Sequence, residues 1–204
     1  MSKMISELIA LVRTYADNNA GASGFAMTAI DGVHIMRRFE PSETLRAVYR
    51  PVLCLVLQGT KQVTAGGKML EFTAGQSFIV SVDMPVMGCI TQADRDFPYL
   101  ALSLDLDMSL MHDIVVELKD AVVSHPEGKD SVFIDETDDA VIDSAFRLMR
   151  LLDRPESIPI LRAPIVKEMQ YWLLAGRHGP AIRQFALPDS YTQRIGPSGW
   201  YSPY

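Results

Sequence analysis

The chain opens with a stretch whose apolar residues repeat at the period of a helix. Between residues 3 and 19, one face collects apolar side chains spaced three and four positions apart: Ile5, Leu8, Ile9, Val12 and Tyr15. This spacing predicts an amphipathic helix, which Ser2 is placed to cap. Segment 18–24 is rich in Asn and Gly and lacks the period, so it predicts a loop.

Between about residues 33 and 106 the apolar period changes to two, which is typical of strands. Short apolar runs, separated by Gly, Pro and Asp, cover 33–38, 52–58, 61–64, 68–72, 77–82, 86–91 and 99–106. Gly66-Gly67 predicts a tight hairpin turn, because glycine adopts the positive φ that such turns need. Many short strands at this spacing predict a β-sandwich or barrel.

The run at 99–106 has the clearest alternation. Four leucines would share one face, Leu100, Leu102, Leu104 and Leu106. The other face would carry Tyr99, Ala101, Ser103 and Asp105. We expect the leucine face to be core and the other face to meet a ligand or solvent.

The helical period returns after Asp107, which can cap the first of three predicted helices. They occupy about 108–118, 135–152 and 158–176, with a short further segment at 180–187. We expect the third helix to bend or restart at Pro164, because proline lacks the amide donor. Segment 196–204 has two Gly and two Pro and predicts an irregular tail. Strands followed by helices predict an α+β fold with the two types segregated.

Composition and charge narrow the classes of function. The 204 residues are 48% hydrophobic and 22% charged, as in ordinary globular proteins. Lys plus Arg number 19 against 25 for Asp plus Glu, a formal charge of -6, so the chain is a poor binder of a phosphate backbone. The sequence shows neither a signal peptide nor a membrane-spanning apolar run. We expect a cytoplasmic protein without a membrane partner, with Cys54 and Cys89 as free thiols.

The sequence offers little catalytic chemistry. Its histidines lie on separate elements without metal-ligand spacing: His34, His112, His125 and His178. The chain has no Gly-x-Ser-x-Gly elbow, no Walker A loop and no Gly-x-Gly-x-x-Gly turn. We therefore expect no catalytic residue, no metal and no cofactor, and we do not expect an enzyme.

Several ordered segments carry a resemblance to a known family. Residues 49–61 read Tyr-Arg-Pro-Val-Leu-Cys-Leu-Val-Leu-Gln-Gly-Thr-Lys, and 81–86 and 98–107 follow in order, as do 151–155 and 175–179. From about 25 to 195 the chain resembles the N-terminal region of one branch of the AraC-type transcriptional regulators. The resemblance implies a cupin-like β-barrel (a double-stranded β-helix) followed by a C-terminal helical subdomain. It also implies a sensory, dimerising module that binds a small organic effector.

On this basis we expect four segments. They are an N-terminal helix and linker at 1–24, the barrel at 25–107, the helical subdomain at 108–195 and the tail at 196–204. Family members usually continue into two helix-turn-helix motifs, whereas here Gly-Pro follows residues 191–195. We therefore expect this chain to lack the DNA-binding domain, through which alone DNA would be bound. The alternatives are a small cupin-fold enzyme without an evident metal site, or a truncated regulator acting by heterodimerisation.

Four residues are candidate effector ligands: Arg37, Tyr49, Gln58 and Tyr99. Arg37 aligns with a basic position on the family's first barrel strand, and its guanidinium can donate two parallel hydrogen bonds to an anionic or carbonyl group. The alternative is a surface charge beside Arg38. Alternation alone leaves open which way the other three face. The helices between Asp107 and Leu187 are the expected homodimer contact.

Overall fold

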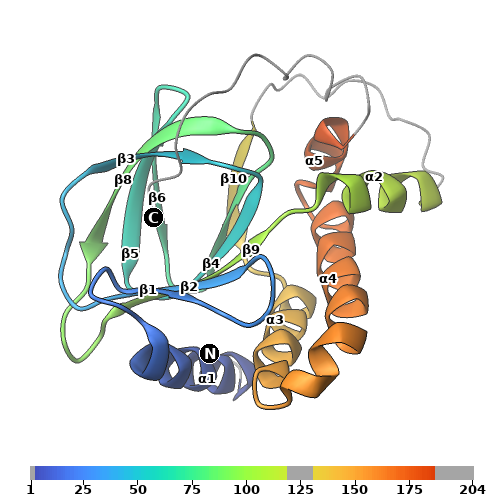
Figure 1. The fold of residues 1–204 in the computed structure, drawn as a ribbon. Helices are drawn as coiled ribbons and strands as arrows, with labels where there is room; N and C mark the ends of the chain where they lie inside the picture. The colour runs from blue at the N-terminus through green and yellow to red at the C-terminus, as the bar shows by residue number, and fades with distance from the viewer. Residues whose placement is uncertain (1–2, 119–130, 187–204) are drawn as a thin grey trace.

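The computed structural model describes residues 3–118 and 131–186, and Figure 1 shows two sheets with helices along one side. The elements in chain order are α1 (Lys3–Asn19), β1 (Phe25–Met27), β2 (Val33–Arg38), β3 (Leu45–Tyr49), β4 (Val52–Gln58), β5 (Thr60–Ala65), β6 (Lys68–Thr73), β7 (Gln76–Val80), β8 (Met84–Gln92), β9 (Tyr99–Asp105), α2 (Met108–Glu117), β10 (Val132–Glu136), α3 (Asp139–Leu151), the 3-10 helix η1 (Pro155–Ser157), α4 (Ile158–Ala175) and α5 (Gly179–Phe185). The mixed α+β composition and the helical C-terminal part are as predicted.

The strands form two antiparallel sheets. One has six strands in the order β1-β2-β9-β4-β7-β10, and the other has four in the order β3-β8-β5-β6. The turn between β5 and β6 has φ of 56° at Gly66 and 79° at Gly67, which confirms the predicted glycine hairpin. Antiparallel sheets of this kind can bury one face against helices and the other against a second sheet.

Two apolar cores lie on opposite faces of the six-stranded sheet. The first joins this sheet to the helices, and includes Leu8 and Val12 of α1 with Leu100, Leu102 and Leu104 of β9. The second draws residues from both sheets: Val56, Val63, Phe72, Phe78, Tyr99 and Ala101 are among its members. The leucines of β9 therefore face the helices, and Tyr99 and Ala101 face the other sheet. The predicted alternation along 99–106 is confirmed, but Tyr99 and Ala101 are buried in the second core, so this part of the other face does not meet solvent.

The helix starts follow capping chemistry. The Asp107 carboxylate accepts hydrogen bonds from the amides of Ser109 and Leu110, at 3.0 and 3.1 Å, which confirms the predicted cap of α2. Asp138 caps α3 through the amide of Ala140 at 2.8 Å. The predicted cap at Ser2 lies outside the described residues.

The structure revises two expectations for the helical part. α4 runs without interruption through Pro164, so the helix does not restart there. Proline removes one backbone hydrogen bond, and the buried face of α4 that follows, with Ile165, Val166 and Met169, holds the helix against its neighbours. Residues 132–136 form β10, which pairs with β7, so strands and helices are not fully segregated.

None of the helices within the described ranges is both long and apolar enough to cross a lipid bilayer.

Candidate ligand-binding site between the sheets

A group of polar side chains lies in the core between the sheets. Four strands contribute one each: Tyr49 from β3, Cys54 from β4, Lys61 from β5 and Tyr99 from β9. The Lys61 ammonium donates a hydrogen bond of 2.8 Å to the Tyr49 hydroxyl and lies 5.5 Å from the centre of the Tyr49 ring. We call these four residues the inter-sheet cluster.

Aromatic rings form the wall around the inter-sheet cluster. Phe72 and Phe78 stack with centroids 4.6 Å apart, and the Tyr49 ring meets Phe78 edge-on at 6.1 Å. Tyr99 is 1% exposed, whereas Tyr49, Cys54 and Lys61 are only partly buried. Solvent therefore reaches the lysine side of the cluster, and the tyrosine of β9 forms its closed end.

Burial sets the protonation of two members of the cluster. Burial raises the pKa of Tyr99 well above its usual value, and the neighbouring Cys54 and Tyr49 add to the effect. Burial also raises the pKa of the Cys54 thiol, against smaller opposing effects of the Lys61 charge and of a hydrogen bond with Tyr99. The phenol and the thiol are therefore neutral near pH 7, and Lys61 supplies the positive charge.

The structure does not bring the four sequence candidates together. Tyr49 and Tyr99 meet in the inter-sheet cluster. Arg37 and Gln58 lie on the opposite face of the six-stranded sheet, against α1. Arg37 pairs with Asp17 of α1, and the Gln58 amide accepts a 2.7 Å hydrogen bond from Arg13 and donates one of 2.8 Å to the carbonyl of Pro98.

A β-bulge explains the placement of Gln58. β4 pairs Val56 with Ala101 and then Gln58 with Leu100, so Leu57 is an extra residue in the ladder. Beyond the bulge, Gln58 shares the helix-facing side with Leu100. Strict alternation would have put Gln58 on the same face as Cys54 and Val56.

Sequence reasoning missed Lys61 and treated Cys54 only as a free thiol. Lys61 lies two residues before the fully buried Val63, so the period of a strand places both on one face. That signal is present in the sequence. It is informative only once the inward face of β5 is known.

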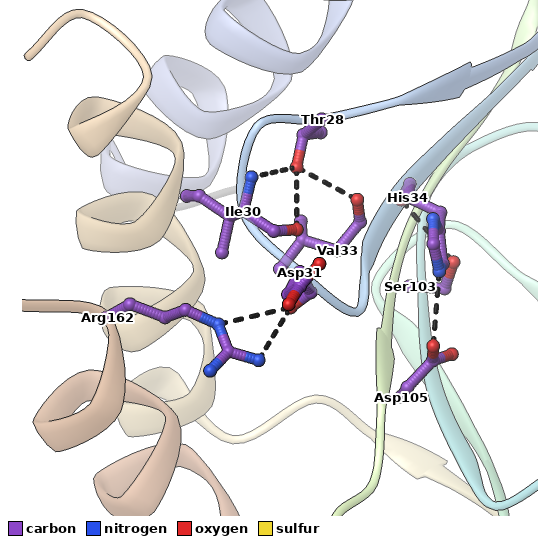
Figure 2. Close-up of polar contacts among 8 residues, drawn as sticks. All are labelled: Thr28, Ile30, Asp31, Val33, His34, Ser103, Asp105 and Arg162. Carbon is purple, nitrogen blue, oxygen red and sulfur yellow. Dashed lines mark hydrogen bonds and ion pairs between the residues drawn. The ribbon is translucent and has the colours of Figure 1, made fainter. Parts of the chain in front are cut away.

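A second polar network joins the six-stranded sheet to the helices (Figure 2). Both Nε and Nη2 of Arg162, in α4, donate to the carbonyl of Asp31 in the loop between β1 and β2, at 3.2 and 2.9 Å. The Thr28 hydroxyl closes the same loop by donating to the carbonyls of Ile30 and Val33. Helix α4 therefore contacts the loop that leads into the start of β2.

The histidines take structural positions. His34 of β2 lies 3.2 Å from the Asp105 carboxylate, His112 lies 3.0 Å from the carbonyl of Ala186, and His178 lies 3.4 Å from Asp135. His125 is outside the described residues. Across residues 3–118 and 131–186, no three His, Cys, Asp or Glu side chains are grouped as a metal site.

Solved structures with a similar fold include two of ToxT from Vibrio cholerae. Wild-type ToxT of strain SCE256, bound to an unsaturated fatty acid, is 9% identical with a TM-score of 0.50, over 78% of this chain and 57% of that chain. ToxT of strain O395, bound to (E)-4-(8-methylnaphthalen-1-yl)but-3-enoic acid, is 10% identical with a TM-score of 0.54, over 81% and 61%. The AraC-like transcriptional activator CuxR is 14% identical with a TM-score of 0.45, over 89% and 66%.

The chain spans less than two thirds of the length of ToxT. Residues 29–181 match the family of the AraC-type transcriptional regulator N-terminus, and the chain belongs to this family. A comparison with curated proteins found no match.

Proposed function

We propose that this chain is the effector-sensing and dimerising part of a cytoplasmic AraC-type regulator, and that it performs no reaction. In this proposal residues 25–107 form a cupin-like barrel that binds a small organic effector, and residues 108–195 form the helical part that pairs two copies. The observation that carries the proposal is the hydrogen-bonded pair of Lys61 and Tyr49, partly exposed within an aromatic wall. An apolar site with a few fixed polar groups is what small ligands require.

The chemistry of the pair favours an acidic effector with an apolar body. The Lys61 ammonium can donate to a carboxylate, and the Tyr49 hydroxyl beside it offers a second polar contact. The rings of Phe72 and Phe78 suit an apolar chain or ring. Both ligands in the ToxT structures, an unsaturated fatty acid and a naphthalenyl butenoic acid, are of this kind.

Binding would act on the helices through the six-stranded sheet. An effector that prefers one arrangement of sheets and helices shifts an existing equilibrium by its difference in affinity for the two. The contact between Arg162 and the carbonyl of Asp31 is one route, because it joins α4 to the loop at the start of β2. We assign DNA binding to a helix-turn-helix domain and not to any of the described residues. The formal charge of -6 agrees with this, because an acidic chain binds a phosphate backbone poorly.

The two cysteines provide a direct test. Cys54 faces the space between the sheets, whereas Cys89 alternates with the buried Ile90 and faces outward. Oleate and 1-naphthoate serve as probes. We expect each probe to slow the alkylation of Cys54 by N-ethylmaleimide and to leave the rate of alkylation at Cys89 unchanged. Mass spectrometry measures both rates.

A second test removes the positive charge of Lys61. Lys61→Met keeps an unbranched side chain that is one atom shorter and removes its charge, so we expect about a tenfold loss of affinity for either probe. Lys61→Arg should retain most of the affinity. Equal affinities of wild type and Lys61→Met, together with equal protection of the two cysteines, would contradict the proposal.

A further inference from the structure

A hollow of about 650 Å³ lies at one end of the six-stranded sheet, away from the inter-sheet cluster. Three loops line it: the loop after α1, which includes Gly24, the loop after β2, which includes Phe39 and Glu40, and the loop between β8 and β9, which includes Arg95. Arg37 and Arg38 at the end of β2 complete the wall. None of the residues of the inter-sheet cluster lines this hollow, so the two sites are separate.

Three arginine side chains line the hollow although the chain as a whole is acidic. Arg37, Arg38 and Arg95 line it against a single carboxylate, Glu40. Like charges drawn from two segments, the end of β2 and the loop between β8 and β9, repel one another unless an anion lies between them. The nearby Asp17 pairs with Arg37 and offsets part of this charge, which leaves the lining with an excess of guanidinium groups.

The arginines are held at fixed positions by their neighbours. Arg37 is mostly buried, pairs with Asp17 and lies over the Phe39 ring at 4.6 Å, and its Nε has no hydrogen-bond partner among the described residues. Arg38 donates a 3.1 Å hydrogen bond to the carbonyl of Ser23. A guanidinium held in this way loses little conformational entropy when it binds an anion.

The loops that form the hollow are also ordered by hydrogen bonds. The Asp94 carboxylate accepts from the amides of Asp96 and Phe97, at 2.8 and 2.7 Å, which fixes the turn that presents Arg95. Gly24 has φ of +79°, and a Cβ there would lie 1.9 Å from the carbonyl oxygen of Arg37. Only glycine lets the loop after α1 approach β2 this closely.

From this geometry we propose that the hollow binds a small phosphorylated metabolite. The phosphate group would accept hydrogen bonds from the forks of Arg37, Arg38 and Arg95, because a dianion with three terminal oxygens matches several guanidinium groups better than one carboxylate does. The organic part would pack on Phe39, which is 41% exposed at the rim. The volume lies within the range of small-molecule sites.

Calorimetric titration of the 204-residue chain tests the proposal. The probes are inorganic phosphate, phenyl phosphate and benzoate. We expect saturable binding of both phosphates, with phenyl phosphate tighter than inorganic phosphate and benzoate weakest. Benzoate binding as tightly as phenyl phosphate would overturn the assignment to phosphate, and absence of saturation by all three probes would overturn the site.

Three variants separate this site from general electrostatics and from the proposed effector site. Arg95→Ala removes an exposed guanidinium from the hollow, and we expect about a tenfold loss of affinity for phenyl phosphate. Arg154→Ala, at another exposed arginine that lies outside the hollow, and Lys61→Met should leave that affinity unchanged. Phe39→Ala should abolish the advantage of phenyl phosphate over inorganic phosphate. Equal losses in Arg95→Ala and Arg154→Ala would overturn the proposal.

Discussion

Tyr99 places an ionisable phenol where water cannot solvate its charged form. Burial raises its pKa well above the usual 10, so the folded protein holds this proton more tightly than the unfolded chain. The stabilisation is therefore complete below pH about 10 and is lost as the pH rises above that value. We expect the free energy of unfolding of the wild type, measured with urea, to fall steeply above this pH.

Tyr99→Phe is the control for this pH dependence, since it keeps the ring and removes the ionisable hydroxyl. Its free energy of unfolding should fall less steeply over the same range. Absorbance of phenolate gives a second reading, because the variant lacks one phenol that ionises only when the protein unfolds. Parallel curves for the two proteins would contradict the assignment.

Some individual residues of the candidate site could be predicted from the sequence and others could not. Tyr49 and Tyr99 were named as candidates although alternation left their facing open, and the structure places both between the sheets. Gln58 could not be placed, because the extra residue Leu57 reverses the facing of the strand and is visible only in the pairing of β4 with β9. Lys61 was missed because the inward side of β5 depends on the opposite sheet, which local sequence does not specify.

Helix α1 closes the outer face of the six-stranded sheet. Its residues Leu8, Val12 and Ala16 are fully buried against the core that the helices share with β9. We expect Leu8→Ala to lower the free energy of unfolding by about 2–5 kcal/mol, because it leaves a cavity where the surroundings cannot fully relax. Urea denaturation measures the change.

Thr14→Ala is the matched control on the same helix, since Thr14 is exposed. It should change the free energy of unfolding by less than about 0.5 kcal/mol. A loss in Leu8→Ala no larger than in Thr14→Ala would show that α1 does not dock on the sheet as the structure has it.

The loop between β1 and β2 connects the sheet to α4 through one side chain. Arg162→Ala removes the two hydrogen bonds to the carbonyl of Asp31. We expect a loss of about 1 kcal/mol in stability and faster hydrogen exchange at the amides of Ile30 and Val33, which are bonded within this loop. The control Arg154→Ala, which changes an exposed arginine, should leave hydrogen exchange at both amides unaltered. Unchanged exchange in Arg162→Ala would contradict the proposed connection between α4 and the loop.

Elements with strong periodicity were predictable, and those that depend on a distant partner were not. The bounds expected for β2 and β4 are those observed, and the first helix spans the predicted 3–19. β1 has three residues and β3 is largely exposed, so neither carries an apolar period. β10 exists because the edge of β7 supplies its hydrogen bonds, which is a non-local cause.

At the scale of the whole molecule, one continuous core joins the sheet to the helices. The core that includes Leu104 of β9 also includes Leu148 of α3 and Met169 of α4. A packed core transmits small displacements because it has few voids to absorb them. A ligand between the sheets would therefore act on the same strands, β4 and β9, that α1 covers on their other face.

In the proposed dimer the two copies meet through the helical part. The exposed apolar side chains of this part mark the expected contact surface. Ile160 and Leu161 of α4 are 74% and 44% exposed, and Val116 of α2 is 61% exposed. Burying such side chains against a second copy is favourable, whereas a carboxylate at the same place would be desolvated without a partner. We expect Ile160→Glu to sediment as a monomer at concentrations where the wild type is a dimer.

Met69→Glu provides the comparison, because Met69 of β6 is 69% exposed and belongs to the four-stranded sheet rather than to the helices. It introduces the same charge on a different surface, so it should remain a dimer in sedimentation velocity. A dimer in Ile160→Glu, with a monomer in Met69→Glu, would move the contact from the helices to the outer face of the four-stranded sheet. The two variants thus decide which layer of the molecule pairs.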